Sequence, residues 1–593
     1  MAFTLQTITA VCLLVYCTSA ADPIVTLSHG GQLRGVSTTF LDSKVDLFLG
    51  VRYAKPPVGK LRFKKTEEAE GWKGVEDAKA PGSICPQIDP TTYKFAGEED
   101  CLFMDITVPG GVQPGAKKPV MVWIPGGGFV MGSGKPYIGA ALATTGDVIT
   151  VSINYRLGVL GFLAIEKGTG NYGLWDQRAA LLWIKQNIAQ FGGDPDLVTI
   201  FGESAGGSSV SAHTIGQHSG DLFKRAIVQS GSAYTLFDQS DNMRYKWEQS
   251  IRESTNCVVK LSTYECLDSK TAEEIVTQIR ILNYIVPVAD DDFFADDVVA
   301  TESYELSKRF DLLTGFNGQE GCLLYLFEVG MMAHAQNKSI LEDGVDMELL
   351  KAFLHTKCTA HITPLSPELC VHWVISTYKL DETDDDRERA IRLVSFLGEQ
   401  IFDERGLEKL QQHSLGKTST YAYYFTQKYT PDPPNPMGTP PDWLKSSADH
   451  GDELPFMFGG PLIRESVANN DIWKRLLEAD ELVQSSLSGL NEDGKPLSLT
   501  MMTMWTNFAK SGNPNQPVAL PKGTPTWPEF TEDNNQFLEL NSNDIQVITT
   551  PNKVRLDKLK VLQKARKVQK DADRRPQNAV KKDSDCKKTK DEL

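Results

Sequence analysis

A serine flanked by glycines is the first group in this sequence that could do covalent chemistry. The stretch VTIFGESAGGSSV, residues 198–210, holds a Gly-x-Ser-x-Gly motif centred on Ser204. So short a motif also occurs by chance in a chain with 48 glycines, and its surroundings must decide its meaning. A serine hydroxyl becomes a nucleophile when a base removes its proton and nearby donors stabilise the oxyanion that forms. The chemistry to test is therefore acyl transfer.

The context of Ser204 favours a nucleophile. A β-branched run predicts a strand that ends near Phe201, and small residues predict a helix that begins near Gly206. In a strand–Ser–helix turn the serine takes strained backbone angles and its hydroxyl stands clear of the sheet edge. Gly202 and Gly206 have no Cβ, so strand and helix can pass closely. The helix N-terminus offers N–H groups where an anion would develop.

A second glycine-rich stretch could supply oxyanion donors. WIPGGGFVMGSG, residues 123–134, places three consecutive glycines directly after a predicted strand. Backbone N–H groups of such a loop can converge on one point, as an oxyanion hole requires. Alone, the stretch would indicate a flexible turn. The presence of Ser204 downstream favours the oxyanion interpretation.

The sequence around these groups alternates between predicted strands and predicted helices, which indicates a parallel sheet covered on both faces. The apolar runs PVMVWI and DVITVSINYRLGVLGFL indicate buried strands. LWDQRAALLWIKQNIAQFGG follows with apolar residues at helical spacing and a Gly-Gly stop. DLVTIF indicates another strand, and the helix after Ser204 comes next. This alternation of strands and helices is typical of α/β proteins.

Composition and charge narrow the class of protein. The 593 residues are 41% hydrophobic and 23% charged, which is ordinary for a soluble globular protein. The formal net charge of −16 argues against a general nucleic-acid binder. Residues 553–593 are different, with 15 Lys or Arg against 7 Asp or Glu. This basic tail is expected to be separate from the folded domain.

Both ends of the chain carry targeting features. Residues 1–20 have an apolar centre and end in the small residues Thr18 and Ala20, which is typical of a cleaved signal peptide. The chain ends in KDEL, residues 590–593, the address read by a KDEL-type retrieval receptor. No other run is long and apolar enough to predict a transmembrane span. We therefore expect a protein of the endoplasmic reticulum lumen.

Cysteine usage and a sequon fit that compartment. Eight cysteines lie outside residues 1–20, and no Cys-x-x-Cys or Cys/His cluster predicts a metal site. The sequon Asn337-Lys338-Ser339 predicts an N-glycan on Asn337. Three pairs of cysteines are close enough in sequence to close short loops, and two others, Cys322 and Cys586, remain. The three pairs are Cys85 with Cys101, Cys257 with Cys266, and Cys358 with Cys370.

Longer motifs resemble the type-B carboxylesterase family, which includes liver carboxylesterases, cholinesterases and bile-salt lipase. FLGVRYAKPPVGKLRF (48–63) is similar to its N-terminal signature, and EEDCLFMDITVP (98–109) to its cysteine-bearing signature. MTMWTNFAKSGNPN (502–515) is similar to its C-terminal helix and turn. The resemblance covers nearly the whole mature chain. It implies a single large α/β-hydrolase domain over residues 21–552, with a mostly parallel central sheet flanked by helices. The charge and the helical spacing of apolar residues after it predict a basic C-terminal helix and tail over 553–593.

The resemblance also implies roles for individual residues. FNGQEG (316–321) is similar to the family's acid motif, which makes Glu320 the group that orients the base. ADHGDELPFMFG (448–459) is similar to its histidine motif, which makes His450 the general base. The chain order serine, acid, histidine agrees with this fold. The implied oxyanion donors are the N–H groups of Gly127, Gly128 and Ala205. The implied disulfides are Cys85–Cys101 and Cys257–Cys266, and the pairing of Cys358 with Cys370 stays open.

The implied activity is cleavage of carboxylic esters through an acyl-enzyme, without metal or organic cofactor, by a broad-specificity carboxylesterase. Cholinesterases carry a tryptophan for the quaternary ammonium between the first two cysteines. Here that loop, PQIDPTTYKFAGEED, has none, which disfavours choline esters. A lipase or an acyltransferase could use the same triad. A non-catalytic adhesion or binding protein on this fold is a further alternative, although such members generally lose a triad residue. The natural substrate, the acyl-chain preference and the oligomeric state stay open.

Overall fold

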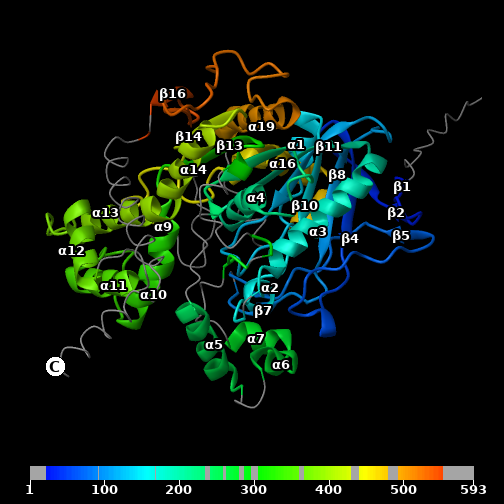
Figure 1. Cartoon of the computed structure of the whole chain (residues 1–593). Coiled ribbons are helices and arrows are strands. Elements are labelled where there is room, and N and C mark those ends of the chain that lie inside the picture. Colours follow the sequence, from blue (N-terminus) through cyan, green and yellow to red (C-terminus); the bar gives the residue numbers. More distant parts are fainter. Residues whose placement is uncertain are drawn as a thin grey trace, which may run out of the picture.

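An eleven-stranded sheet forms the centre of the molecule (Figure 1). Its strands lie in the order β16-β15-β14-β13-β12-β11-β9-β10-β8-β4-β3. Neighbouring strands are parallel from β10 to β15, and the pairs at both edges are antiparallel. The strands are β3 (Val36–Phe40), β4 (Ser43–Arg52), β8 (Phe103–Pro109), β9 (Lys118–Ile124), β10 (Ile149–Ile153), β11 (Gly193–Glu203), β12 (Arg225–Gln229), β13 (Asp311–Asn317), β14 (Thr420–Phe425), β15 (Gln536–Leu540) and β16 (Gln546–Thr549).

The structure is a computed structural model. It describes residues 22–90, 92–166, 168–233, 241–257, 262–278, 286–290, 292–294, 305–359, 366–428, 440–478, 492–549 and 551. The predicted signal peptide and the predicted basic tail with its KDEL address lie outside the described residues.

Alternation along β9 explains why both faces of the sheet are covered. Val120, Val122 and Ile124 belong to the hydrophobic cluster that contains residues of α3 and α4. Met121 and Trp123 belong to the cluster on the other face, with residues of α1 and α19. Successive strand residues point to opposite faces, so a strand buried on both sides is apolar throughout. The helices of the two faces are α1 (Ala140–Gly146), α2 (Gly158–Phe162), α3 (Tyr172–Asn187), α4 (Ala205–Ile215), α15 (Leu454–Met457), α16 (Gly460–Asn469), α17 (Asp471–Glu478) and α19 (Lys495–Ser511).

One predicted strand is wrong in part. The run DVITVSINYRLGVLGFL forms β10 only as far as Ile153, and its second half forms helix α2. Gly158 takes a positive φ of 52° where this helix begins, which turns the chain away from the sheet. A short, fully buried apolar run has no alternation that separates a strand from a helix. The expected helix LWDQRAALLWIKQNIAQFGG is present as α3.

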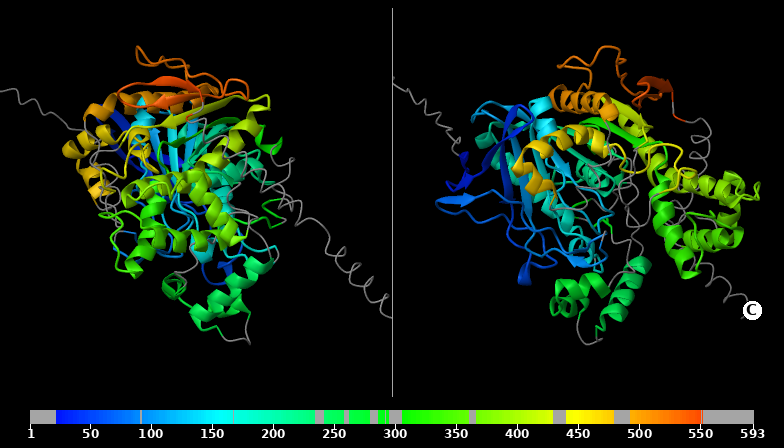
Figure 2. Two further views of the ribbon diagram at one scale, coloured as in Figure 1. Left: turned by 90° about the vertical axis from the view of Figure 1, so that its left-hand side faces the viewer. Right: turned by 180° about the vertical axis from the view of Figure 1, so that it is seen from behind.

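Further helices stand beside the sheet. In Figures 1 and 2, α10 to α13 form a group to one side of the sheet, and α5 to α7 form another. The first group has a hydrophobic core of its own, which includes Tyr325, Leu350, Phe353 and Leu393. The helices are α5 (Asp241–Thr255), α6 (Thr263–Asp268), α7 (Ala272–Gln278), α9 (Gly321–Leu324), the π-helix η4 (Tyr325–Val329), α10 (Gly330–Ala335), α11 (Met347–Thr359), α12 (Pro367–Tyr378), α13 (Asp386–Gly398), the π-helix η5 (Glu399–Asp403) and α14 (Glu404–Ser414).

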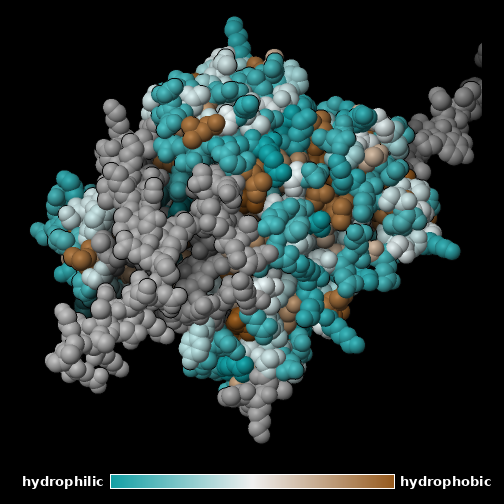
Figure 3. All heavy atoms as spheres, in the orientation of Figure 1, coloured by the Kyte–Doolittle hydropathy of each residue, from teal (hydrophilic) through white to brown (hydrophobic). Residues whose placement is uncertain are grey.

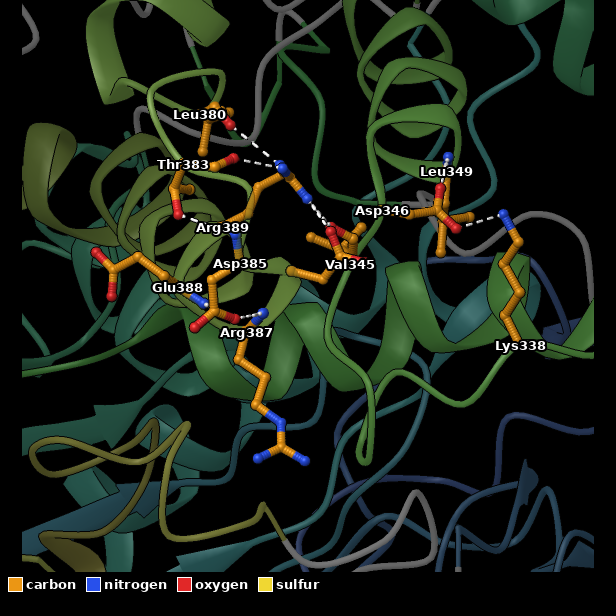
Figure 4. A network of polar contacts seen from close by, with 11 residues as sticks. Lys338, Val345, Asp346, Leu349, Leu380, Thr383, Asp385, Arg387, Glu388 and Arg389 are labelled. Carbon is orange, nitrogen blue, oxygen red and sulfur yellow. Dashed lines mark hydrogen bonds and ion pairs between the residues drawn. The ribbon is translucent and has the colours of Figure 1, made fainter.

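Polar contacts fix the start of α13 (Figure 4). The side chain of Asp385 caps this helix by accepting hydrogen bonds from the N–H groups of Arg387 and Glu388 at 2.9 and 3.4 Å. The guanidinium of Arg389 is buried and bonds to surrounding backbone. Its backbone acceptors are the carbonyl oxygens of Val345 at 2.9 Å, Leu380 at 3.0 Å and Thr383 at 2.6 Å, and it also pairs with the Asp386 carboxylate. These bonds set the register of α13 against the loops around it.

Three disulfides are formed within the described part of the chain. Cys85–Cys101 and Cys257–Cys266 are the predicted pairs. Cys358–Cys370 also forms and links α11 to α12, so the pairing that the sequence leaves open exists in the structure. On the face seen in Figure 3, hydrophilic residues predominate and hydrophobic residues form small separate groups. Among the described residues, no helix combines the length and the apolar character needed to cross a membrane.

Candidate active site

Ser204 occupies a sharp turn between strand β11, which ends at Glu203, and helix α4, which begins at Ala205. Its φ of 57° and ψ of −124° are unusual for a residue with a Cβ. The N–H of Ser204 donates to the carbonyl of Gln229 at 2.9 Å, and its carbonyl accepts from the N–H of Ser208 at 2.8 Å. These two bonds hold the strained conformation. The predicted strand–Ser–helix turn is therefore formed.

The close crossing of strand and helix beside Ser204 depends on glycine. A Cβ on Gly206 would overlap the carbonyl oxygen of Ile124, and one on Gly202 would lie 2.6 Å from the carbonyl carbon of Gly206. Both obstacles are backbone atoms, so neither could yield without a shift of β9 or α4. The two glycines of the motif therefore make the turn possible, as the sequence predicts.

Glu320 and His450 meet although they are 130 residues apart in the chain. Glu320 lies in the turn that connects β13 to α9, and its Oε2 is 2.6 Å from Nδ1 of His450. Its other oxygen accepts hydrogen bonds from the hydroxyl of Ser230 at 2.6 Å and the N–H of Asn317 at 2.5 Å. Both side chains of the pair are buried. The carboxylate is thus fixed at both oxygens, and it orients the imidazole ring.

The second imidazole nitrogen faces Glu203. Nε2 of His450 lies 3.0 Å from Oε1 of Glu203, the residue directly before Ser204. Between the described residues Ser204 and His450 there is no hydrogen bond in this structure. Catalytic hydrogen bonds are often incomplete without substrate and tighten when it binds. The structure therefore joins the predicted acid to the predicted base, and it places the serine beside them without a direct bond.

The predicted oxyanion loop lies against the serine. Gly127 and Gly128, directly after β9, have φ values of 109° and 62°, which residues with a Cβ rarely adopt. A Cβ on Gly126 would lie 3.2 Å from Cβ of Ser204, so the loop and the nucleophile are in close proximity. Within the described part of the chain, the N–H groups of Gly127, Gly128 and Ala205 donate to no protein acceptor. Three donors are thus free beside the serine.

Comparison with known proteins identifies the family. The family model described as the carboxylesterase family matches residues 21–558. The chain belongs to the carboxylesterase family. Carboxylesterase 5A of Felis catus is 33% identical over 542 residues, which cover 88% of this chain and 91% of that protein. Acylcarnitine hydrolase of Mus musculus is 33% identical over 549 residues and 88% of each chain. Carboxylesterase 3 of Homo sapiens is 32% identical over 561 residues and 90% of each chain.

Membership in the carboxylesterase family confirms two predictions from the sequence, the α/β-hydrolase fold and the enzyme class, a carboxylic ester hydrolase. In this fold a ligand binds outside the carboxyl ends of the parallel strands. Ser204 follows β11, Ser230 follows β12 and Glu320 follows β13, all at that edge. The geometry therefore gathers the candidate residues where a carboxylesterase would need them.

Two further acidic residues, Glu203 and Glu453, have no role that the sequence motifs predict. Glu203 lies within the serine motif and Glu453 within the histidine motif, so their place in those motifs was the available signal. The side chains of Gln229 and Asn317 donate to the two oxygens of Glu453 at 3.0 and 2.7 Å. Burial, together with Glu203 and Glu320, raises the pKa of Glu453 to about 8, well above its usual value of 4.5.

Two of these carboxylates, Glu203 and Glu320, change the pKa of the His450 imidazole. Burial lowers the pKa of His450, but the Glu203 and Glu320 carboxylates outweigh it and raise that pKa well above its usual value of 6.5. Asp449 accepts the backbone N–H of His450 at 2.7 Å, and burial and the nearby Asp452 raise the pKa of Asp449 to about 8. The Glu203 and Glu320 carboxylates therefore favour the protonated form of the imidazole.

The predicted glycosylation site is accessible. Asn337 is exposed at the end of α10, and its sequon continues into an exposed Ser339. No group of three or more His, Cys, Asp or Glu side chains suited to a metal ion occurs among the described residues.

Proposed function

We propose that the chain hydrolyses carboxylic esters through an acyl-enzyme on Ser204, with His450 as the general base and Glu320 as the group that orients it. The observation that carries the proposal is the 2.6 Å contact of Glu320 with Nδ1 of His450, beside a serine held on a strand–helix turn. Family membership supports the class of reaction, and the geometry supports the assignment of these residues.

In the first step the Ser204 hydroxyl attacks the ester carbonyl and gives its proton to Nε2 of His450. For this, Nε2 must exchange its contact with Glu203 for one with the serine. The negative oxygen of the tetrahedral intermediate accepts hydrogen bonds from the N–H groups of the oxyanion loop and of Ala205. The loss of one such donor typically lowers turnover by about 10²–10³-fold.

To complete acylation, His450 donates its proton to the leaving alcohol, and the ester bond breaks to leave an acyl group on Ser204. Water then attacks the acyl-enzyme while His450 removes its proton. Collapse of that intermediate releases the acid and restores the serine. An alcohol in place of water would give acyl transfer, and the rest of the machinery would be unchanged.

The test is hydrolysis of p-nitrophenyl esters from acetyl to lauroyl by the purified mature protein, with Ser204→Ala as the blank. An acylcarnitine belongs in the panel because one relative is an acylcarnitine hydrolase. Serine-dependent turnover is the expected result, and the optimal chain length would separate an esterase from a lipase. Addition of a short alcohol would reveal acyl transfer. Absence of turnover from folded protein would instead favour a binding role on this fold.

The acid side of the pH profile is expected to move when Glu203 is changed. The base works only as neutral imidazole, so kcat/KM falls as His450 becomes protonated at low pH. Because the Glu203 carboxylate raises the pKa of His450, Glu203→Gln should lower that pKa and shift the acid limb to lower pH. The measurement is kcat/KM for p-nitrophenyl acetate from pH 5 to pH 9. Glu76→Gln, on the exposed strand β5 (Val75–Asp77), is the control. An unshifted limb in Glu203→Gln would contradict the assignment of His450 as base.

We further propose that the protein resides in the endoplasmic reticulum lumen and is returned there by a KDEL-type receptor. The three disulfides and the exposed sequon at Asn337 support an oxidising, glycosylating compartment. Deletion of residues 590–593 is expected to secrete the protein, measured as ester hydrolase activity in the medium of expressing cells. A matched control replaces Lys587 and Lys588 with alanine and keeps the address. Continued retention of the truncated chain would point to another anchor.

A further inference from the structure

The helix run α13–η5–α14 passes directly against the acid of the candidate triad. A Cβ on Gly398, the last residue of α13, would lie 2.8 Å from the backbone nitrogen of Gly321 and 3.2 Å from Cβ of Glu320. A Cβ on Gly321 would overlap the carbonyl oxygen of Val394. Gly398 has ordinary helical angles, with φ of −64°, so only the close approach requires glycine there. The two helices therefore meet at a pair of glycines, immediately beside Glu320.

The same helix run also contacts the base. Phe402, in the π-helix η5, has its ring centroid 4.3 Å from that of the His450 imidazole, with the ring planes inclined by 32°. Gly398 and Phe402 are four residues apart and so lie on the same side of the helical run. Carboxylates lie at both nitrogens of the imidazole, and Phe402 covers one of its faces. A ring held this way has little freedom to tilt.

The tilt of the ring matters because Nε2 has to choose between two adjacent residues of the chain, Glu203 and Ser204. In this structure Nε2 faces Glu203, and catalysis requires it to face the serine hydroxyl. An aromatic face also attracts the imidazolium that forms when the serine gives up its proton. The start of α13 is fixed by the Asp385 cap and the buried Arg389 (Figure 4), so the helix brings Gly398 and Phe402 to the site in a set register.

We propose that Gly398 and Phe402 are positioning residues of the acid–base pair. Gly398 lets the helix approach close enough for Glu320 to reach His450. Phe402 holds the plane of the imidazole ring so that Nε2 can pass from Glu203 to Ser204 without loss of the Glu320 contact. This inference rests on the proposed function, because it assigns the two residues an effect on Ser204-dependent turnover.

The first test compares Phe402→Leu with Phe402→Tyr. Leucine keeps apolar bulk without a ring face, and tyrosine keeps the ring. Phe402→Leu is expected to lower kcat about 10-fold, to the same extent for acetyl, butyryl and hexanoyl p-nitrophenyl esters and with KM little changed. Phe402→Tyr is expected to retain activity near that of the wild type. Thermal unfolding of both variants is measured as well. If both unfold at the wild-type temperature, a merely structural role of Phe402 predicts equal kcat values for the two variants. Full activity of Phe402→Leu, or a loss that varies with acyl length, would overturn the proposal, since the latter marks a wall of the substrate pocket.

The second test uses a matched pair of glycines in the same helix run. Gly398→Ala places a methyl group against Glu320, and we expect kcat to fall about 100-fold through displacement of the acid. Gly406→Ala is the control, because its Cβ would lie 3.5 Å from the Phe316 ring, an ordinary contact. Equal kcat values for the two variants would contradict the proposal. If Gly398→Ala does not fold, the Phe402 pair decides.

The Ser204→Ala blank separates this inference from the proposed function. A wild-type protein without Ser204-dependent turnover would mean that the proposed function is wrong. If the wild type shows such turnover and Phe402→Leu has the same kcat, the proposed function stands and only the positioning roles are rejected.

Discussion

Replacement of Ser204 with alanine is expected to lower kcat for ester hydrolysis by about 10⁵-fold or more, in the range seen when a serine hydrolase loses its nucleophile. Ser204 supplies the hydroxyl at the turn between β11 and α4, beside the oxyanion loop. The residual rate should come from the oxyanion donors and from binding alone. The loss should therefore fall on kcat rather than on KM.

The same substitution is expected to leave the fold intact. The strain at φ of 57° arises from the Cβ atom, which serine and alanine share, so the change adds no backbone penalty. The two hydrogen bonds that hold Ser204 use its backbone, not its hydroxyl. The measurement is kcat for p-nitrophenyl butyrate together with the thermal unfolding midpoint, and the exposed Ser376→Ala on α12 serves as control. Activity above a few per cent of the wild type would move the nucleophile elsewhere.

The serine turn could be predicted from sequence because its causes are local. A β-branched strand, two glycines around Ser204 and small helical residues all lie within residues 198–210. The strand β9 was predictable for the same reason, since burial on both faces makes it apolar throughout. Local signals failed at α2, where the apolar run has the composition of a strand but Gly158 turns it out of the sheet.

The acid and the base could be named only through the resemblance to a family. Glu320 and His450 are far apart in the chain, and neither stretch has a spacing that indicates a contact with the other. Glu203 and Glu453 lie inside those motifs, but the effect of Glu203 on the imidazole and the raised pKa of Glu453 depend on burial and on distances in the folded chain. A sequence position does not report such a pKa shift.

Phe402 had no signal in the sequence. It lies on a helix that is remote in the chain from both triad motifs, and its contact with His450 exists because Gly398 and Gly321 let two helices cross closely. The role of such a glycine pair can be recognised only once the structure shows that the two helices cross there. The disulfide Cys358–Cys370 is similar: nearness in sequence allowed it, and the packing of α11 against α12 brings the two sulfurs together.

The second large effect is expected from Glu320→Gln, which should lower kcat by about 10⁴-fold, as in other serine enzymes whose orienting carboxylate becomes an amide. The hydroxyl of Ser230 and the N–H of Asn317 both donate to one oxygen of Glu320. The glutamine oxygen would take those bonds, and its NH₂ group would then face Nδ1 of His450. An NH₂ donor requires Nδ1 to be an acceptor, so the imidazole proton would sit on Nε2.

With its proton on Nε2 the imidazole cannot accept the proton of Ser204, and the base is lost although every atom stays near its place. The prediction is checked by kcat for p-nitrophenyl butyrate, with KM little changed because the amide keeps the size of the carboxylate. Glu320→Asp is the matched comparison: it keeps the charge and the tautomer but withdraws the carboxylate by one methylene, so it should lose less activity than Glu320→Gln. A glutamine variant within tenfold of the wild type would mean that Glu320 does not set the tautomer of His450. The 2.6 Å contact would then be a structural one, and the acid of the triad would have to be sought at Glu203, the other carboxylate that the imidazole touches.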